Sequence, residues 1–557
     1  MKKILSCTLL TIAVTFASQT LTAQKKEIPK GWHMMDATDS GYYGISINKA
    51  YDFVKSKNLK STPVIVAVID SGIDTLHEDL KPILWRNPKE IPGNGIDDDK
   101  NGYVDDVYGW NFLGSRDGRN VEKDSYEAAR VYHQFKAKYD GKRINADTLK
   151  GDAKLEYSMW AKAKEDIVGD VNPLMVMQLR KMLKDLKAGD SIISADLKKE
   201  EYNCTDLGAY TPTVIAARKV KDILLSICKG NDNNEISNVQ ILNELEGELG
   251  KAEAADRAPK NFRNDIVGDN YDDINDRFYG NSNVMVNNSS ALHGTHVAGI
   301  IAAAHNNGVG MDGVADNVRI MAVRAVPDGD EHDKDIALAI RYAVDNGARV
   351  INMSFGKGFS PNKKWVDEAV KYAEGKGVLL VHAAGNSAQN IDTVKNYPMP
   401  EFSDKTRATN WITVGASGPE NKEGSTLTAS FSNYGKKEVD VFAPGEKIYS
   451  TVPGGNTYQN LQGTSMASPV VAGLAAFILE YYPKLSPAQV KYVIEKSSRP
   501  PAGTVKTPGT GDDAPLSEIS KSGGVINAFD AIKLASTLKP EGNNPKQKTK
   551  VKQKIRA

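Results

Sequence analysis

The stretch that decides the fold is Val64-Ile65-Val66-Ala67-Val68-Ile69-Asp70-Ser71-Gly72. It is an apolar run of strand length, rich in β-branched residues, that ends in a carboxylate and a glycine turn. Runs that are apolar on both faces are typical of parallel sheets, in which functional side chains collect at the carboxyl ends of the strands. We therefore expect Asp70 to lie at such an edge, with a simple turn or cap residue as the alternative interpretation.

Two other segments place reactive side chains where apolar helices are expected to start. They are His293-Gly294-Thr295-His296-Val297-Ala298-Gly299 and Gly463-Thr464-Ser465-Met466-Ala467-Ser468-Pro469, the latter followed by an apolar run over 470–477. Free backbone N–H groups and the positive end of the helix dipole would stabilise negative charge beside Ser465. Acyl transfer needs a nucleophile, a general base and an orienting carboxylate, and these residue types occur here in the order Asp, His, Ser.

With a fourth block, Ala383-Ala384-Gly385-Asn386, the chain resembles the subtilisin-like serine proteases, the subtilases. The matching blocks occur in the order of that family, and the resemblance covers roughly residues 42–114 and 265–535. It implies that Asp70 orients His293, that His293 acts as general base and then general acid, and that Ser465 attacks. It also implies that the side-chain amide of Asn386 and the backbone N–H of Ser465 bind the oxyanion.

The competing histidine is His296, which lies one helical turn beyond His293. We prefer His293 because it precedes the apolar helix and fits the position of the family's base. The resemblance further implies a cleft that pairs with extended peptide backbone and is lined by Ser354, Phe355, Gly356, Ala384 and Gly385. Ordinary strand ends in the core are the alternative for these five residues.

The rest of this region alternates between patterns typical of strands and helices. Strands are expected over 318–323, 350–356, 378–383, 411–416 and 439–445, and helices over 333–346 and 364–374. Repeated βα units predict an α/β fold with a doubly wound, mostly parallel sheet.

A long helical insertion separates the expected acid from the expected base. Between about residues 119 and 261 the sequence becomes charged, helical in pattern and poor in runs typical of strands. Helices are expected after Ser125, over 174–187 with a stop at Gly189, and from Thr211 to Gly230. The insertion could restrict access to the active site, or it could be an appendage without influence on catalysis.

An acidic loop supplies a second chemical signal, which predicts a structural calcium site of the kind that the resemblance to subtilases also implies. Asp97, Asp99, Asn101 and Asp105 place oxygen atoms at alternating positions, as hard cations require. Residue 108, where an EF-hand would have its glutamate, is a tyrosine, so an EF-hand is not expected. The alternative is a solvated acidic turn, and no organic cofactor is expected.

Composition and targeting signals fit a secreted enzyme or one of the cell envelope. The 71 basic and 70 acidic residues nearly cancel, which does not favour nucleic acid or an anionic membrane as the main partner. The N-terminus resembles a cleaved leader, with Lys2 and Lys3, an apolar run over 4–16 and then Ala23. This apolar run is too short to span a membrane. A lipid-attachment site at Cys7 is the weaker alternative.

The expected organisation has five parts. They are a signal peptide (1–23), the first part of a catalytic domain (24–118), the helical insertion (119–261), the rest of the catalytic domain (262–535) and a basic, disordered tail (536–557). Cys204 and Cys228 in the insertion could form a disulfide or remain free. About twenty residues separate Ala23 from the mature-like start at Gly44, too few for the pro-region that many relatives carry.

The function expected from these observations is serine endopeptidase activity on protein or peptide substrates. A serine hydrolase that acts on esters or non-peptide amides is one alternative. A pseudoprotease that binds peptides without cutting them is the other. The oligomeric state is left open by the sequence.

Overall fold

A computed structural model describes residues 28–541, except 170–172, 200, 231–233, 235 and 420–426. The expected leader, the cysteine at position 7 and the basic residues of the tail beyond 541 lie outside the described residues.

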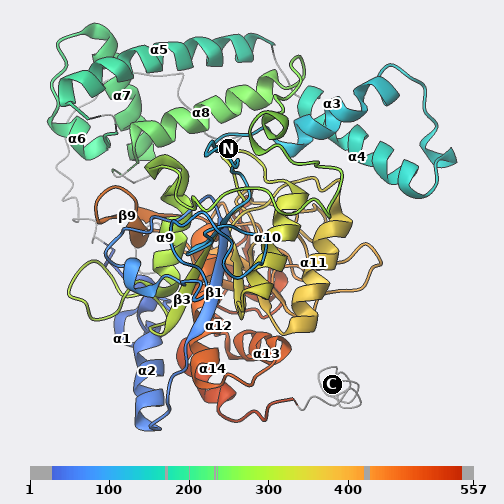
Figure 1. Ribbon diagram of the computed structural model, residues 1–557. Coiled ribbons are helices and arrows are strands. Elements are labelled where there is room, and N and C mark those ends of the chain that lie inside the picture. Colours follow the sequence, from blue (N-terminus) through green and yellow to red (C-terminus); the bar gives the residue numbers. More distant parts are fainter. Residues whose placement is uncertain are drawn as a thin grey trace.

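A seven-stranded sheet forms the centre of the molecule (Figure 1), in the order β2-β3-β1-β4-β5-β6-β7. All neighbouring strands are parallel. The strands are β1 (Val64–Asp70), β2 (Gly109–Asn111), β3 (Val318–Arg324), β4 (Val350–Met353), β5 (Leu379–Ala383), β6 (Trp411–Ser417) and β7 (Val441–Pro444). Because they are parallel, the carboxyl ends of β1, β3, β4 and β5 meet at one edge of the sheet.

Helices cover both faces of this sheet. Val66 and Val68 of β1 share one core with α2 (Ile47–Ser56), α9 (Asn288–Ala302), α12 (Thr464–Tyr481), α13 (Pro487–Ser497) and α14 (Ala528–Ala535). Ala67 and Ile69 point to the other core, which contains α10 (Asp333–Asp345) and α11 (Lys363–Lys376). This alternation along β1 is that of a strand buried on both faces. The predicted doubly wound α/β fold is confirmed.

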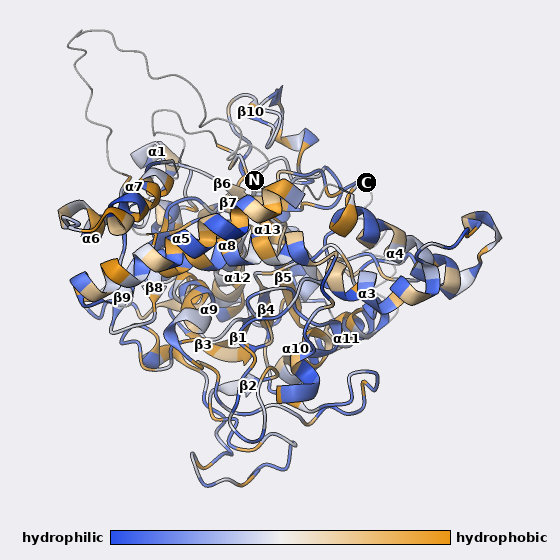
Figure 2. Cartoon of the chain, turned by 90° about the horizontal axis from the view of Figure 1, so that it is seen from above, coloured by the Kyte–Doolittle hydropathy of each residue, from blue (hydrophilic) through white to orange (hydrophobic). Residues whose placement is uncertain are grey.

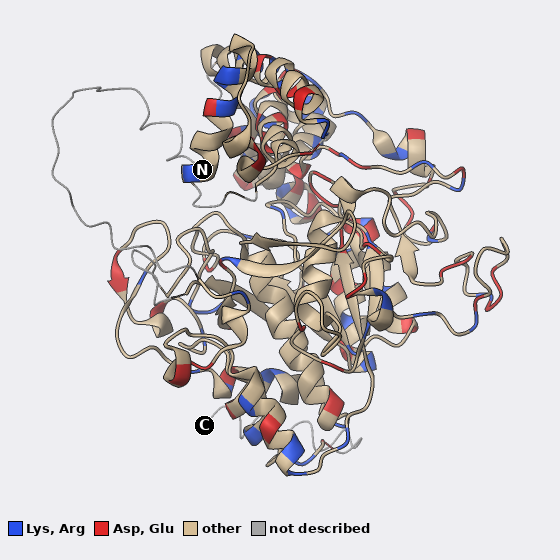
Figure 3. Ribbon diagram, turned by 90° about the vertical axis from the view of Figure 1, so that its left-hand side faces the viewer, with Lys and Arg blue, Asp and Glu red and all other residues tan. Residues whose placement is uncertain are grey.

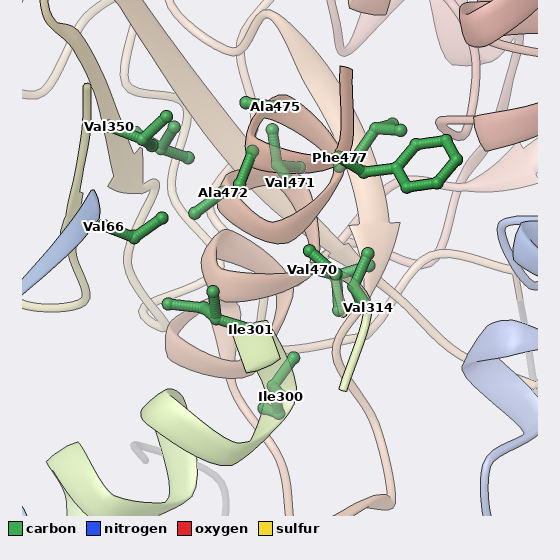
Figure 4. Packing of buried hydrophobic residues seen from close by; sticks show 14 of the residues in the cluster. Val66, Ile300, Ile301, Val314, Val350, Val470, Val471, Ala472, Ala475 and Phe477 are labelled. Carbon is green, nitrogen blue, oxygen red and sulfur yellow. The ribbon is translucent and has the colours of Figure 1, made fainter. Parts of the chain in front are cut away.

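The helix α12 lies at the centre of the first core. Figure 4 shows its side chains between Val66 and Val350 of the sheet and Ile300 and Ile301 of α9. Among the described residues it is the one helix long and apolar enough to cross a bilayer. However, 89% of its apolar window is buried inside the protein, as expected for a core helix.

Short elements complete the catalytic part of the chain. Two antiparallel pairs lie outside the main sheet, β8 (Ile448–Val452) with β9 (Thr457–Leu461) and β10 (Val505–Lys506) with β11 (Asp513–Ala514). The one-turn helix α1 (Ala37–Ser40) precedes α2.

The predicted insertion is helical and lies on the side of the molecule where the strands end (Figures 1 and 2). Its helices are α3 (Glu127–Tyr139), α4 (Gly151–Val168), α5 (Pro173–Leu197), α6 (Cys204–Ala209), α7 (Ile215–Gly230) and α8 (Asn238–Glu253). They build two separate small cores: α3 packs with α4, and α5 packs with α6, α7 and α8. Figure 3 shows many charged residues on these helices and few in the central sheet.

A disulfide and a close contact at a glycine hold the second of these cores together. Cys204 and Cys228 are joined by a disulfide, which settles their pairing. Gly189 was expected to end a helix, but α5 continues to Leu197. A side chain at 189 would place its Cβ 2.3 Å from Cγ2 of Val220, so glycine serves a close approach of α5 and α7 instead of a stop.

Candidate active site

The side chains of Asp70 and His293 meet at the carboxyl edge of the sheet. Asp70 ends β1, and His293 lies in the second turn of α9, because that helix begins five residues earlier than the sequence suggested. The Nδ1 atom of His293 is 2.7 Å from Oδ1 of Asp70, and the Ser71 N–H donates to the same oxygen at 2.7 Å. The carboxylate is 3% exposed and the imidazole 36%. Asp70 therefore holds the inner ring nitrogen, and the outer one is left for the cleft.

The approach of α9 to the end of β1 depends on Gly294. A Cβ at this position would lie 2.2 Å from the carbonyl oxygen of Gly72 and 3.1 Å from Cβ of Asp70. Both distances are shorter than a normal van der Waals contact, so a larger residue would push the histidine helix away from the carboxylate. The His-Gly pair in the sequence is thus a packing requirement of the site.

The charge states of the two candidate histidines differ. Burial opposes the charged form of His293, but the attraction of Asp70 and their hydrogen bond raise its pKa overall. His296 is fully buried, its Nε2 lies 3.0 Å from the Gln459 carbonyl, and burial lowers its pKa to about 3. The structure therefore gives His296 a packing role and brings His293 to the carboxylate.

Ser465 lies in the first turn of α12 and contacts Ser354, the residue that follows β4. Its Oγ donates to the Ser354 carbonyl at 3.1 Å, and the Ser354 hydroxyl donates to the Ser465 carbonyl at 2.9 Å. Among the described residues, no hydrogen bond joins Ser465 to His293. The hydroxyl proton of Ser465 is thus directed to the Ser354 carbonyl in this structure.

Asn386 is held by the turn that precedes Ser465. Its Oδ1 accepts from the Thr464 N–H at 2.9 Å and from the Thr464 hydroxyl at 2.8 Å. Because the Oδ1 atom accepts both hydrogen bonds from Thr464, the Nδ2 atom of Asn386 is the group that faces outward. A Cβ on Gly463 would lie 3.3 Å from Asn386 Nδ2 and 3.6 Å from the Ser465 nitrogen. The missing side chain at 463 thus leaves space between two donors, which is what an oxyanion site requires.

The five expected substrate residues lie at the ends of the neighbouring strands β4 and β5. Ser354 contacts Ser465, as described, and the Phe355 carbonyl accepts from Nε2 of His382 at 2.8 Å. The Ala384 carbonyl accepts from the amides of Asn396 and Asn433, and the Gly385 N–H donates to the Thr464 hydroxyl at 3.0 Å. These last two groups already have partners inside the protein. The Ser354 and Phe355 carbonyls also have internal partners, so these contacts do not favour one of the two strand ends for pairing with a peptide.

The acidic loop brings together a different set of ligands from the expected one. Carboxylate oxygens of Asp97, Asp99 and Glu90 lie within 4.8 Å of one another. The Asp105 carboxylate does not join them, because it accepts from the N–H groups of residues 93, 94 and 95. The Asn101 amide donates to Asp106, and its Oδ1 accepts from the Tyr103 N–H. The sequence motif does not indicate Glu90, because this residue precedes the motif and only the intervening turn brings it close to Asp97 and Asp99.

The base of the insertion is anchored beside the site by buried charges. Arg130 of α3 bonds the carboxylate of Glu127, and its guanidinium donates to the carbonyls of Asp330 and Glu331 beyond β3. Lys357, which is 2% exposed, bonds Glu127 at 2.8 Å. Buried pairs of this kind are costly to break, since removal of one partner leaves an uncompensated charge. The insertion is therefore fixed at its root.

Comparisons with known proteins identify the family of the chain. A family model described as the subtilase family (Peptidase_S8) matches residues 61–515, more than half of the chain. Thermophilic serine proteinase of Bacillus sp. (strain AK1) is 46% identical over 187 residues, which are 33% of this chain and 42% of that protein. Subtilisin DY of Bacillus licheniformis is 43% identical over 203 residues, 36% of this chain and 67% of that protein.

Thermitase of Thermoactinomyces vulgaris is 38% identical over 243 residues, which are 43% of this chain and 80% of that protein. The match with the Bacillus AK1 protein thus spans less than half of that relative, whereas the match with thermitase spans most of it. From the family model, the chain belongs to the subtilase family of serine-type endopeptidases.

Proposed function

We propose that this chain is a serine endopeptidase of the cell exterior or envelope that cleaves protein or peptide substrates with Asp70, His293 and Ser465. The observation that supports it best is the 2.7 Å contact between Asp70 and His293 at the sheet edge where α12 presents Ser465. The disulfide between Cys204 and Cys228 supports an oxidising compartment, in agreement with the expected leader.

The proposed reaction uses these groups in sequence. Neutral His293 takes the proton of Ser465 Oγ as this oxygen attacks the peptide carbonyl carbon, and Asp70 stabilises the resulting imidazolium. The carbonyl oxygen becomes an oxyanion between Asn386 Nδ2 and the Ser465 N–H. His293 then gives its proton to the leaving amine as the C–N bond breaks. Water hydrolyses the acyl-enzyme by the same route and regenerates the serine hydroxyl.

The test of this function is digestion of casein by the full chain, together with labelling by a fluorophosphonate. A serine endopeptidase is expected to fragment casein and to carry the label on Ser465. Ester hydrolysis without casein digestion would favour the other serine hydrolases. Peptide binding with neither label nor cleavage would instead favour a pseudoprotease.

We also propose that the acidic loop binds a structural calcium ion through Asp97, Asp99 and Glu90. Oxygen ligands of this kind suit a hard cation, and the ion would offset the repulsion of three neighbouring carboxylates. Burial raises the pKa of Glu90, although N–H groups of the loop bond its carboxylate, so a bound cation would favour the charged form of this group.

Calcium is expected to raise the melting temperature, and a chelator to lower it. At a free concentration of 100 times Kd, linkage gives about 2.7 kcal/mol of stabilisation. The variant Glu90→Gln should lose most of this response, whereas Asp265→Asn, at an exposed position of the helical turn Arg263–Val267, should keep it. If neither calcium nor chelator changed the melting temperature of the unaltered protein or of the two variants, the proposed site would be contradicted.

The insertion is proposed to restrict the entry of folded protein substrates. Its lobe of α5, α6, α7 and α8 lies over the edge where the strands end (Figures 1 and 2), and its root is fixed by buried charges. The alternative is that the insertion is an appendage that does not influence catalysis.

Replacing residues 170–253 by a short Gly/Ser linker tests this restriction. Ile167 and Ala254 share one small core, so a short linker can join the end of α4 to Ala254 and leave α3 and α4 in place. Casein cleavage is expected to rise more than cleavage of a short peptide. Equal changes for the two substrates, in a variant that melts cooperatively, would favour the appendage.

A further inference from the structure

A buried cation without an acidic partner lies directly behind the turn that carries Asp70. Arg324 is the last residue of β3 and pairs in register with Asp70 of β1. Its side chain is 1% exposed. In the part of the chain that the structure describes, no carboxylate lies within ion-pair distance of its guanidinium. A charge buried in this way is costly, so its retention at this position needs a reason.

The guanidinium ties three separate segments together. Its Nε donates to the Ser71 carbonyl at 2.8 Å, one terminal nitrogen to Asn111 Oδ1 at 3.0 Å, and the other to the Val121 carbonyl at 2.6 Å. Ser71 belongs to the turn after β1, Asn111 ends β2, and Val121 leads into the insertion. The planar guanidinium spreads its donors over three nitrogen atoms and can reach three separate segments, whereas the donors of a lysine all lie on one nitrogen atom.

The turn that Arg324 holds is the one that sets the Asp70 carboxylate. The Ser71 N–H donates to the same Asp70 oxygen that His293 contacts. A Cβ on Gly72 would lie 3.5 Å from Cδ of Arg324, so the arginine stem packs against the next residue of this turn. Gly72 in turn is the residue against which Gly294 of the histidine helix packs. The contacts thus run without a gap from Arg324 to the acid–base pair.

The charge of Arg324 persists at neutral pH. Burial lowers its pKa to about 10, and the attraction of Glu122 opposes this shift. Two titratable groups lie near Arg324 and the acid–base pair of Asp70 and His293. They are the buried His296, on the same helix as His293, and Glu122, on the segment that enters the insertion. Arg324 therefore keeps a fixed positive charge behind the turn of this pair, and a positive charge nearby disfavours the charged form of a histidine such as His293. Such an effect is screened little by salt in a buried setting.

We infer that Arg324 is a positioning residue of the proposed reaction, which fixes the turn of Asp70 and links it to the root of the insertion. This inference rests on the proposed function and adds a residue that neither touches substrate nor belongs to the triad. It also connects the insertion, through the Val121 carbonyl, to the turn whose Ser71 N–H holds Asp70.

The test compares Arg324→Gln and Arg324→Lys with the unaltered protein on a short peptide substrate. Arg324→Gln is expected to lower kcat by roughly 10–10²-fold with little change in KM, since misplacement of a catalytic group by about 1 Å has an effect of this size. It should also move the acid limb of the kcat/KM profile to higher pH, because loss of a positive charge raises the pKa of His293. Arg324→Lys should lower kcat but leave the acid limb in place.

The matched control is Arg319→Gln, on the same strand but at the opposite end, where Arg319 pairs in register with Ile65. It should change neither kcat nor the acid limb. A wild-type kcat in Arg324→Lys, or an acid limb of Arg324→Gln that coincides with that of the unaltered protein, would overturn the inference.

A second measurement separates this inference from the proposed function. The pKa of His293 can be followed by NMR in the absence of substrate, with the resonance assigned by His293→Ala. It should rise in Arg324→Gln relative to Arg324→Lys, whether or not the protein hydrolyses peptides. An unchanged His293 pKa would refute the role of Arg324, whereas failure to cleave casein would refute only the proposed function.

Discussion

Ser465→Ala is expected to reduce peptide hydrolysis by several powers of ten, roughly 10⁶-fold, without loss of folding. The hydroxyl is the proposed nucleophile, and alanine has no atom that can form the acyl-enzyme. The members of a triad act as a unit, so His293 and Asp70 cannot compensate. Ser465 is half-buried at the start of α12, and its hydroxyl makes one described hydrogen bond, to the Ser354 carbonyl. Removal of this bond should change the melting temperature little.

The matched control is Ser354→Ala, which removes the hydroxyl that contacts the Ser465 carbonyl. This variant should retain activity within about tenfold and should still take a fluorophosphonate label. Ser465→Ala should take none. Turnover by Ser465→Ala near the rate of the unaltered protein would contradict the assignment of the nucleophile.

The central sheet could be predicted because each strand is encoded locally. β1, β3 and β5 are apolar runs of strand length, and each ends in a polar residue or a glycine turn. The predicted strand over 318–323 is thus extended by only one residue in the structure. The order of the strands follows from parallel βα units, which leave few alternatives for the chain.

The helices of the insertion were predictable only in part. α7 presents several apolar residues on one face, and its predicted end at Gly230 is observed, although the helix begins at Ile215 and not at Thr211. α4 buries only Trp160, Ala163 and Ile167 among charged residues, so its pattern is too sparse to recognise. Gly189 misled the prediction because a glycine that ends a helix and one that permits close packing look the same in sequence.

Prediction of the site residues from the sequence is limited in the same way. Asp70, His293 and Ser465 each lie in a local motif, and the sequence is sufficient to name them as candidates. Arg324 carries no such signal. Its three acceptors come from residues 71, 111 and 121, which only the folded chain brings together. Glu90 joins the acidic loop in the same non-local way.

Asn386→Ala is expected to lower kcat by about 10²–10³-fold with little change in KM, the range for loss of one oxyanion donor. The physical reason is that Nδ2 gains its acceptor only when the carbonyl oxygen becomes negative. An interaction made only in the transition state contributes to kcat and not to substrate binding. A change confined to KM would instead make Asn386 a binding residue.

Alanine alone leaves one ambiguity, because it also removes the oxygen that accepts from Thr464. Asn386→Asp resolves it. The aspartate keeps an oxygen for the Thr464 N–H and hydroxyl, at the positions that Asn386 Oδ1 occupies at 2.9 and 2.8 Å, but offers no donor and adds a negative charge. If the amide donates to the oxyanion, Asn386→Asp must be slower than Asn386→Ala, because the new charge repels the oxyanion. If Asn386 merely supports the Thr464 turn, Asn386→Asp must be the faster of the two. The order of the two kcat values therefore decides between the two roles of this side chain, independently of the size of either loss.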